Sequence, residues 1–166
     1  MDNILTRRSI RKFRSNHVTD EDIEKILRAA MSAPSAANKQ PWEFIVIKDR
    51  KILDKIPEFH PYAKMAREAS IAIVVCGDTR RSDDRGFWIQ DCAAASQNIL
   101  LAANSLGLGS VWCGVYPKED LTDKFKELFN LPKEVYPVSF IPIGYPNEEK
   151  PPSERFDEDK IHNDKW

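Results

Sequence analysis

The sequence has no excess of charge of either sign, because 25 Lys and Arg residues stand against 26 Asp and Glu residues in a chain of 166. Such a balance gives no global field toward nucleic acid or an anionic membrane, so an anion site must come from a local cluster. Glycine is scarce, with 6 residues against 11 prolines, which indicates stiff connections. A chain of this length can bury a core as one domain, 1–166, without metal or disulfide crosslinks.

Cysteine and histidine are also sparse, and neither forms a metal-binding pattern. No C-x-x-C pair occurs, and the cysteines are odd in number and lie in apolar stretches, which argues against a zinc or iron–sulfur site. We therefore expect buried free thiols in a reducing compartment. The three cysteines are Cys76, Cys92 and Cys113. The three histidines, which we expect at the surface, are His17, His60 and His162.

Long apolar runs are missing as well. The longest apolar stretch, 92–108, is interrupted by Ser, Gln and Asn residues, and it is too short and too polar to cross a bilayer. The first residues reach a basic cluster without the apolar segment of a secretory signal. We expect a cytoplasmic protein with no membrane partner.

Helical and strand patterns alternate along the chain, which predicts a layered α/β sandwich. Thr19 is the expected N-cap of the first long helix, and Gly107 the residue that follows a long central helix. The central helix is apolar on several sides, so we expect it to be buried or to face another subunit. The predicted helices cover 20–33, 49–56, about 84–106 and 117–131. The predicted strands cover 44–47, 71–76, 111–115 and 138–143, with 71–76 in the centre of the sheet.

The last part of the chain, 145–166, has three prolines, many charges and no helical or strand period. A stretch of this length without structure of its own is usually disordered or functional. Phe156 and Trp166 favour docking, because aromatic side chains bury a large apolar area on a surface. We therefore expect an extended C-terminal arm.

Arginine is concentrated near the start of the chain, at Arg7, Arg8 and Arg11, with Ser9 between them. A guanidinium group binds phosphate oxygens through two hydrogen bonds, and a hydroxyl adds a short donor to the same anion. Taken alone, the cluster also suits a solvated basic segment or a weak nucleic-acid patch. The balanced net charge and the lack of interleaved aromatic residues argue against nucleic acid as a partner.

A second candidate segment, 34–42, follows the first long helix. Its small residues would let the backbone approach a flat ligand, and its amides could pair with a ring edge that presents N–H and C=O groups. The other interpretation is an ordinary loop whose Asn and Gln side chains bond to local backbone. Trp42 is expected in the core. The candidate ligand-contacting residues are Pro34, Ser35, Ala36, Asn38 and Gln40.

A third candidate segment, 107–117, has two glycines in a G-x-G pattern and then Trp112, Cys113 and Gly114. The pattern follows a helix and enters a strand, which is the reverse of the dinucleotide-binding order, and the Gly-Lys-Ser/Thr of a phosphate loop is missing. Read alone, the segment is a helix C-terminus followed by a strand. The chain has no nucleophile–base pattern of a hydrolase.

Together, these three segments and Arg155 in the tail resemble the FMN-dependent nitroreductase family in order and spacing, from about Arg7 to Phe156. The Ala-rich helix leading into Leu-Gly-Leu-Gly-Ser belongs to the resemblance. It implies an α+β fold of the nitroreductase type, an α/β/α layered sandwich whose central, mainly antiparallel sheet is flanked by helices. It also implies a homodimer with FMN at the subunit interface and the C-terminal tail exchanged between subunits.

The resemblance further implies a set of residues that bind the FMN phosphate. Many members of the family carry a second basic residue where this chain has Ser153, and Lys150 is the candidate substitute. The implied phosphate-binding residues are Arg7, Ser9 and Arg155, with Arg8 beside them.

The flavin ring would have its own contacts. Arg11 would lie near the N1/O2 edge of the ring, where positive charge stabilises the reduced flavin, and the Gly114 N–H would lie near N5. One side of the ring would be lined by Pro34, Ser35, Ala36, Asn38 and Gln40, and the other by Trp112, Cys113 and Gly114.

The implied activity is hydride transfer from NAD(P)H through flavin N5 to a nitroaromatic, a quinone or a similar small acceptor, in ping-pong order. The sequence decides neither the acceptor nor the choice between NADH and NADPH. Two alternatives keep the flavin: a non-catalytic flavin-binding or storage protein, and a specialised flavin dehydrogenase of the same fold. A third alternative is a basic interaction protein without a cofactor.

Overall fold

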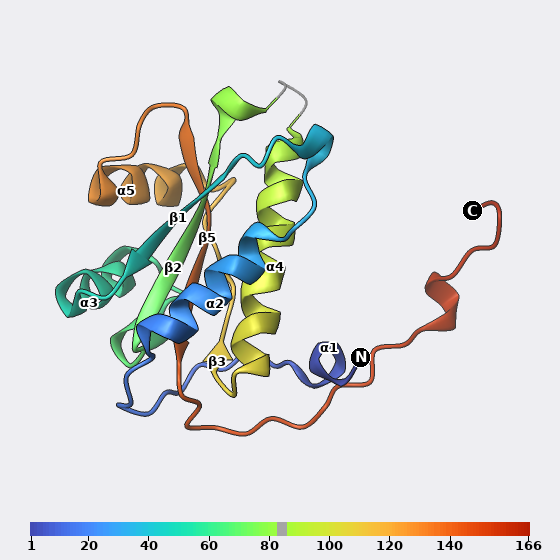
Figure 1. Cartoon of the computed structure of the whole chain (residues 1–166), viewed down its shortest axis with the longest axis horizontal. Coiled ribbons are helices and arrows are strands. Elements are labelled where there is room, and N and C mark those ends of the chain that lie inside the picture. Colours follow the sequence, from blue (N-terminus) through green and yellow to red (C-terminus); the bar gives the residue numbers. More distant parts are fainter. Residues whose placement is uncertain (83–85) are drawn as a thin grey trace.

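The computed structural model describes residues 1–82 and 86–166 and shows an antiparallel sheet with helices on both faces (Figure 1). β2 (Ile71–Asp78) lies in the middle of the sheet, between β1 (Trp42–Ile47) and β5 (Val135–Gly144). Every residue of β2 is buried, as its continuous apolar run predicts. The predicted α+β fold with a mainly antiparallel sheet is confirmed.

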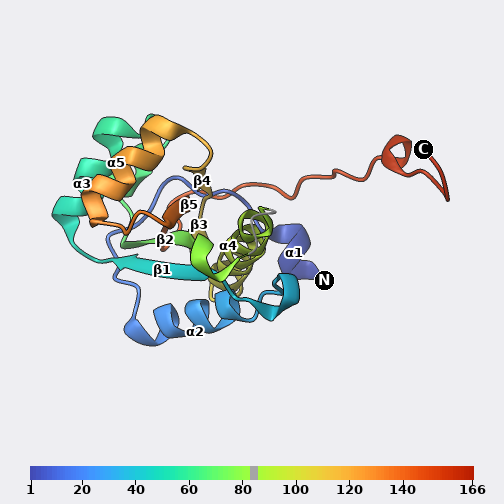
Figure 2. The ribbon, with the colours of Figure 1, turned by 90° about the horizontal axis from the view of Figure 1, so that it is seen from above.

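Two pairs of helices cover the two faces of the sheet (Figure 2). α2 (Asp20–Met31) and α4 (Phe87–Ser105) pack on one face, and α3 (Arg50–Phe59) and α5 (Glu119–Phe129) pack on the other. Successive residues of a strand point to opposite faces, so β2 contributes to both cores. A short first helix, α1 (Asp2–Thr6), which the sequence did not predict, lies beside the C-terminal end of α4.

The helix ends follow the signals in the sequence. Thr19 is the N-cap of α2, because its side chain accepts a hydrogen bond of 3.1 Å from the N–H of Asp22. Gly107 lies just beyond α4 with φ at 72°, a region that glycine adopts without the strain of a side chain. The expected start of α4 near residue 84 lies outside the described residues.

The prediction of a single strand over 111–115 is wrong. Two short strands, β3 (Gly109–Ser110) and β4 (Cys113–Gly114), take its place, and both pair with β5. They share one register, in which Val111 would lie opposite Pro142. Proline has no N–H to donate to the facing carbonyl, so the ladder is interrupted at this point.

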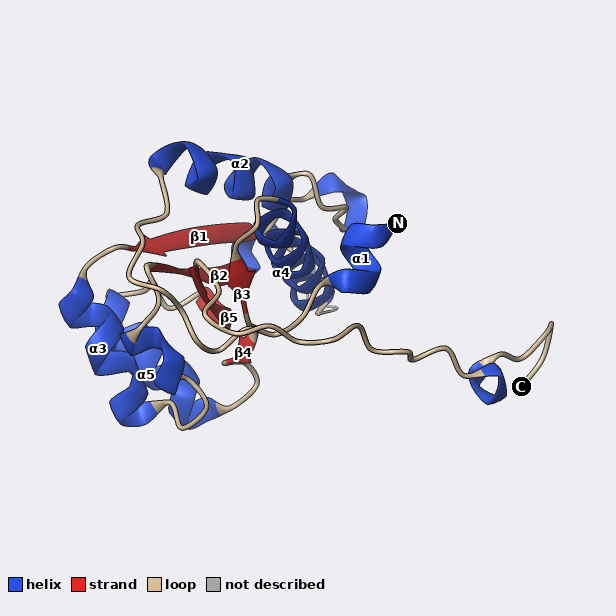
Figure 3. Ribbon diagram, turned by 90° about the horizontal axis from the view of Figure 1, so that it is seen from below, coloured by secondary structure: helices blue, strands red, loops and turns tan. Residues whose placement is uncertain are grey.

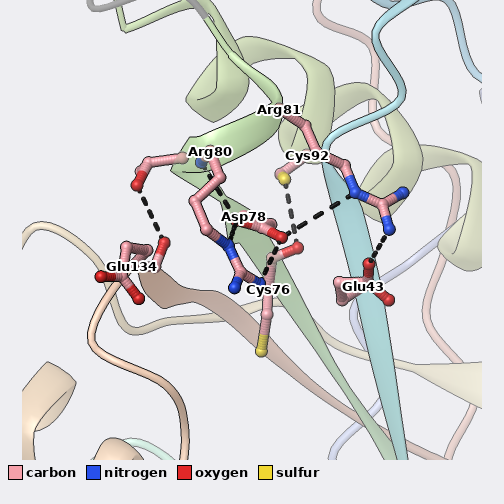
Figure 4. Close-up of polar contacts among 8 residues, drawn as sticks. Glu43, Cys76, Asp78, Arg80, Arg81, Cys92 and Glu134 are labelled. Atoms are coloured by element: carbon pink, nitrogen blue, oxygen red, sulfur yellow. Dashed lines mark hydrogen bonds and ion pairs between the residues drawn. The ribbon is translucent and has the colours of Figure 1, made fainter.

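An ion-pair cluster ties the ends of β1 and β2 together (Figure 4). Asp78 is buried at the end of β2, and its two carboxylate oxygens each accept a hydrogen bond of 2.8 Å from the Arg80 guanidinium. Arg81 bridges the same carboxylate and Glu43 on β1, at 3.8 and 3.2 Å. The hydrogen bonds from Arg80 hold the pKa of Asp78 below its usual value, despite the opposing effect of burial.

The three cysteines are unpaired and buried, as predicted. The Cys92 thiol donates to the carbonyl oxygen of Cys76 across 3.5 Å (Figure 4). Burial raises the pKa of the Cys76 and Cys113 thiols to about 12, so neither is a nucleophile at neutral pH. Within residues 1–82 and 86–166, no group of His, Cys, Asp and Glu side chains could hold a metal ion. No helix in these ranges is long and apolar enough to cross a membrane.

The tail leaves the body of the molecule as an extended arm (Figure 3). All residues of 151–166 are exposed, including 71% of Phe156 and the whole of Trp166. Its regular structure is one short turn of 3-10 helix, Glu158–Lys160. The predicted docking of the arm therefore does not take place on its own chain.

Candidate active site

The N-terminal arginine segment runs beside the third candidate segment. The N–H of Ile10 donates to the carbonyl oxygen of Ser110 across 3.0 Å, and Ser9 forms a parallel bridge with Ser110. Gly109 permits this approach, since a Cβ at that position would lie 2.7 Å from Cγ2 of Ile10. The first and third segments, far apart in the sequence, thus lie side by side.

The start of the tail packs against the same arginine segment. Arg8 Nε donates to the carbonyl oxygen of Pro151 across 2.7 Å, and Lys150 Nζ donates to the carbonyl oxygen of Ser9 across 2.6 Å. Lys150, the candidate substitute for a missing basic residue, is therefore held at the arginine segment. Ser153 accepts a hydrogen bond of 3.0 Å from Arg155 Nε.

The positive charges of two other arginines act on Arg7. Burial lowers the pKa of Arg7, and the positive charges of Arg155 and Arg8 lower it further. Nη2 of Arg8 is buried and has no hydrogen-bond partner in the described part of the chain. A buried hydrogen-bond donor without a partner raises the free energy of the folded state, and so do like charges that lie near one another. A bound anion would offset both effects. The cluster of Arg7, Arg8 and Arg155 therefore fits a multiply charged anion such as a phosphate group.

A cavity of about 730 Å³ lies next to the arginine segment. This volume is within the usual range of small-molecule sites. The floor of the cavity includes the buried residues Met65, Val111 and Val115. The predicted ring-contacting residues that line it are Arg11, Trp112, Cys113 and Gly114.

His60 is buried beneath the cavity, so its prediction as a surface residue is wrong. Its Nδ1 accepts a hydrogen bond of 3.3 Å from the N–H of Tyr62, which leaves the proton on Nε2. That nitrogen donates to the carbonyl oxygen of Gly114 across 3.2 Å. Burial lowers the pKa of His60, and the charge of Lys118 acts in the same direction. The neutral imidazole thus fixes β4 at the cavity wall.

The lowered pKa of His60 predicts a loss of stability in mild acid. Below about pH 6.5, the ordinary histidine pKa, the unfolded chain takes up a proton that the folded chain resists. The free energy of unfolding should therefore fall as the pH drops, by up to about 1.4 kcal/mol per unit for one proton. In His60→Gln, which keeps a donor but does not titrate, urea unfolding between pH 7.5 and 5.5 should show a flatter profile. The exposed control His17→Gln should keep the wild-type slope, and equal slopes in all three proteins would contradict the assignment.

The second candidate segment does not reach this cavity within the chain. Ala36 N–H donates to Asp91, near the start of α4, across 3.0 Å. The arginine segment lies near the other end of α4, where Asn104 bonds to Asn3 (Figure 1). At a rise of 1.5 Å per residue, Asp91 and Asn104 are roughly 20 Å apart along the helix. Trp42 is buried in the core, as predicted.

The side chains of the second segment bond to one another. Gln40 Nε2 donates to Asn38 Oδ1 across 2.9 Å, and the Gln40 N–H donates to Ser35 Oγ across 3.0 Å. Asn38 and Gln40 have φ of 54° and 48°, a strained backbone region that functional loops often contain. The half-buried and exposed positions of this loop include all five candidate residues: Pro34, Ser35, Ala36, Asn38 and Gln40.

The loop that follows α3 supplies site residues that no sequence motif marked. His60 and Tyr62 hold the wall through hydrogen bonds, and Lys64 lines the cavity. Glu148 was also missed, although it accepts the backbone N–H of Arg11 and pairs with Lys150 at 3.2 Å. These residues become visible only through contacts between distant segments.

The fold and the site define a class of protein: an antiparallel α+β domain with an arginine-rich N-terminal segment that borders a cavity of ligand size. The family model described as "Nitroreductase family" matches residues 4–60 and 58–145. The chain therefore belongs to the nitroreductase family.

Named relatives agree with this assignment. The chain is 54% identical to the "Putative NADH dehydrogenase/NAD(P)H nitroreductase" of Methanothermobacter thermautotrophicus, over 98% of the chain and 85% of the relative. It superposes on the crystal structure of a "Putative NADH Oxidase" from Clostridium acetobutylicum with a TM-score of 0.95 at 47% identity, covering 99% of this chain and 100% of the other. An FMN-dependent nitroreductase of Clostridium difficile gives a TM-score of 0.92 at 32% identity, with all of both chains covered.

Proposed function

We propose that this protein is an FMN-dependent NAD(P)H oxidoreductase that passes a hydride to a nitroaromatic, a quinone or a similar small acceptor. The observation that carries the proposal is the arginine cluster with its unpartnered buried donor, on the same N-terminal segment as Arg11, which lines the cavity. The names of the relatives support the same class, since they include an FMN-dependent nitroreductase and an NADPH nitroreductase. The three unpaired thiols support a reducing, cytoplasmic location.

Each part of the site has a task in this proposal. The phosphate of FMN would be held by Arg7, Ser9 and Arg155, with Arg8 and Lys150 beside them. Arg11 would place its positive charge at the ring edge, and the β4 backbone at Gly114, fixed by His60, would face the reacting side of the ring. Bound FMN supplies the hydride acceptor and donor, so the protein needs no side-chain nucleophile.

A homodimer would complete this site, and we include it in the proposal. None of residues 34–40 is among the residues that line the cavity, and this segment is held at the start of α4, whereas the arginine segment lies at the other end of the helix. The outer positions of α4 carry no charged residue, because the single charge in the helix, Asp91, is buried. An uncharged outer surface is typical of a helix that packs against a second subunit. Pro34, Ser35, Ala36, Asn38 and Gln40 would then reach the cavity of the partner.

The test of the proposal is the visible absorption spectrum of the purified protein, followed by identification of the chromophore released by heat. We expect flavin bands and FMN at about one per chain, with rapid bleaching by NADH or NADPH in the absence of oxygen. A flavin that neither nucleotide bleaches would indicate a storage protein instead. A colourless protein that takes up no added FMN would overturn the proposal.

Arg11 offers a sharper test of the ring-edge assignment. Replacing it with alanine removes a positive charge from the place where negative charge develops, so flavin reduction should slow by roughly tenfold or more. Stopped-flow bleaching of the bound flavin by NADH measures this rate. Arg14→Ala, a nearby exposed arginine outside the cavity, is the matched control. Wild-type rates and wild-type FMN retention in Arg11→Ala would show that the assigned role is wrong.

A further inference from the structure

The cavity has an uneven distribution of charge. Its ionised lining residues are four cations and one carboxylate, although the whole chain has a net charge of −1. Three of the cations are lysines at its outer edge, and all three are exposed. We call them the basic mouth: Lys12, Lys64 and Lys118.

No carboxylate neutralises the basic mouth. Within residues 1–82 and 86–166, none of its lysines has an acidic side chain at ion-pair distance. The one acid of the cavity, Glu68, accepts the backbone N–H of Phe13 across 3.3 Å instead. Positive charge is therefore concentrated at the entrance while the residues below it, such as Val111 and Met65, are apolar.

An exposed aromatic side chain lies beside one of these lysines at the cavity. Tyr62 is 69% exposed, and Lys118 Nζ lies 5.4 Å from the centre of its ring. The backbone of Tyr62 is fixed at both ends, because its N–H donates to His60 and its carbonyl oxygen lies 3.6 Å from the Cys113 thiol. An aromatic ring on a fixed backbone, next to a cation, suits a flat ligand that carries a negative group.

We propose that the basic mouth selects substrates that carry an oxyanion, a carboxylate or a phosphate, on a flat ring system. The inference rests on the proposed function, since it assigns the substrate class of the same site. When a cavity has apolar walls and positive charges at its entrance, the local concentration of negatively charged ligands rises. The oxyanion has two sources, the 2′-phosphate of NADPH or a carboxylate on the electron acceptor.

The experiment compares two matched pairs of substrates. One pair is NADPH and NADH with a fixed acceptor, and the other is 4-nitrobenzoate and its neutral near-isostere 4-nitrobenzamide with a fixed nucleotide. For each pair, the ratio of kcat/KM for the charged member to that for the neutral one is measured in wild type, in Lys64→Gln/Lys118→Gln, and in the remote control Lys51→Gln. Each exposed charge contributes about two- to fivefold, so the double variant should lower at least one ratio by roughly five- to tenfold.

Equilibrium binding gives a second readout that needs no turnover. If the carboxylate of the acceptor is the source, calorimetric titration of 4-nitrobenzoate and 4-nitrobenzamide should show the same loss of preference in the double variant and none in Lys51→Gln. A change in the nucleotide ratio alone identifies the 2′-phosphate as the source, and a change in the acceptor ratio and in the titration identifies the carboxylate. Ratios and affinities that match wild type for both pairs would overturn the inference.

The inference and the proposed function fail in different ways. Suppose that the enzyme reduces 4-nitrobenzamide with NADH, but that the ratio of kcat/KM between charged and neutral substrates is the same in every variant. The proposed function would then stand, and the role of the basic mouth in substrate selection would be ruled out. Conversely, the protein could bind 4-nitrobenzoate selectively through Lys64 and Lys118 and yet never transfer a hydride. The role of the basic mouth in binding would then stand, and the proposed reaction would be ruled out.

Discussion

The double variant Arg7→Ala/Arg155→Ala is expected to purify without bound FMN. Both guanidinium groups belong to the cluster in which like charges lower the pKa of Arg7. Hydrogen bonds to charged groups contribute about 1.5–3 kcal/mol each, so removing two sets should weaken FMN affinity by a hundredfold or more, on the order of 3 kcal/mol. Quenching of flavin fluorescence during titration of the apoprotein measures the change.

Riboflavin is the matched ligand for this variant, because it has the same ring but no phosphate group. Its affinity should change little when the phosphate-binding arginines are lost. Arg28→Ala, on the exposed face of α2, serves as a protein control for the loss of one arginine. An equal loss of FMN and riboflavin affinity would mean that the two arginines support the fold and not the phosphate.

Much of the fold can be predicted from the sequence because its signals are local. The β-branched run at 71–76 marks the central strand, Thr19 marks the start of α2, and Gly107 marks the end of α4. The break between β3 and β4 is caused by Pro142, which is distant in the sequence. Only the register of the strands places this residue opposite Val111. Local patterns carry no information about register, so this break could not be predicted.

The sequence also marked candidate site residues, whose roles stay predictions. Its arginines and glycines stand out by composition, and the structure brings Arg7–Arg11, 107–114 and Arg155 together. The burial of His60 depends on α3 placing the residue that follows it against β4, which no local pattern shows. The role of the second segment, 34–40, is still a prediction that requires the partner subunit.

If the arm takes part in the proposed homodimer, truncation after Phe156 is expected to weaken subunit association without unfolding the subunit. Residues 157–166 are exposed in the chain, so the subunit loses few contacts of its own. Ile161 and Trp166 would lose burial on the partner, at about 1.5–3 kcal/mol for each apolar side chain. With two arms per dimer, the dimer dissociation constant should rise by at least about a hundredfold. Sedimentation velocity over a dilution series measures it.

A point variant separates the apolar contacts from the length of the arm. Ile161→Ser/Trp166→Ser in the full-length chain should reproduce most of the effect, whereas Trp166→Phe, which keeps an aromatic ring, should retain most of the affinity. Urea unfolding of each variant at a fixed low concentration checks that the subunit itself remains intact. A truncated protein that dimerises as tightly as wild type would rule out a role of the arm in assembly.

The separation within one chain between residues 34–40 and the cavity has a thermodynamic consequence. In the proposed assembly each FMN touches two chains at once, so it binds the pair and not the separate subunits. Subunit association and cofactor binding are then linked, and each strengthens the other by the same factor. Dilution of the protein should release flavin, and an excess of flavin should hold the subunits together, so that the cofactor acts as a clamp between chains as well as a redox group.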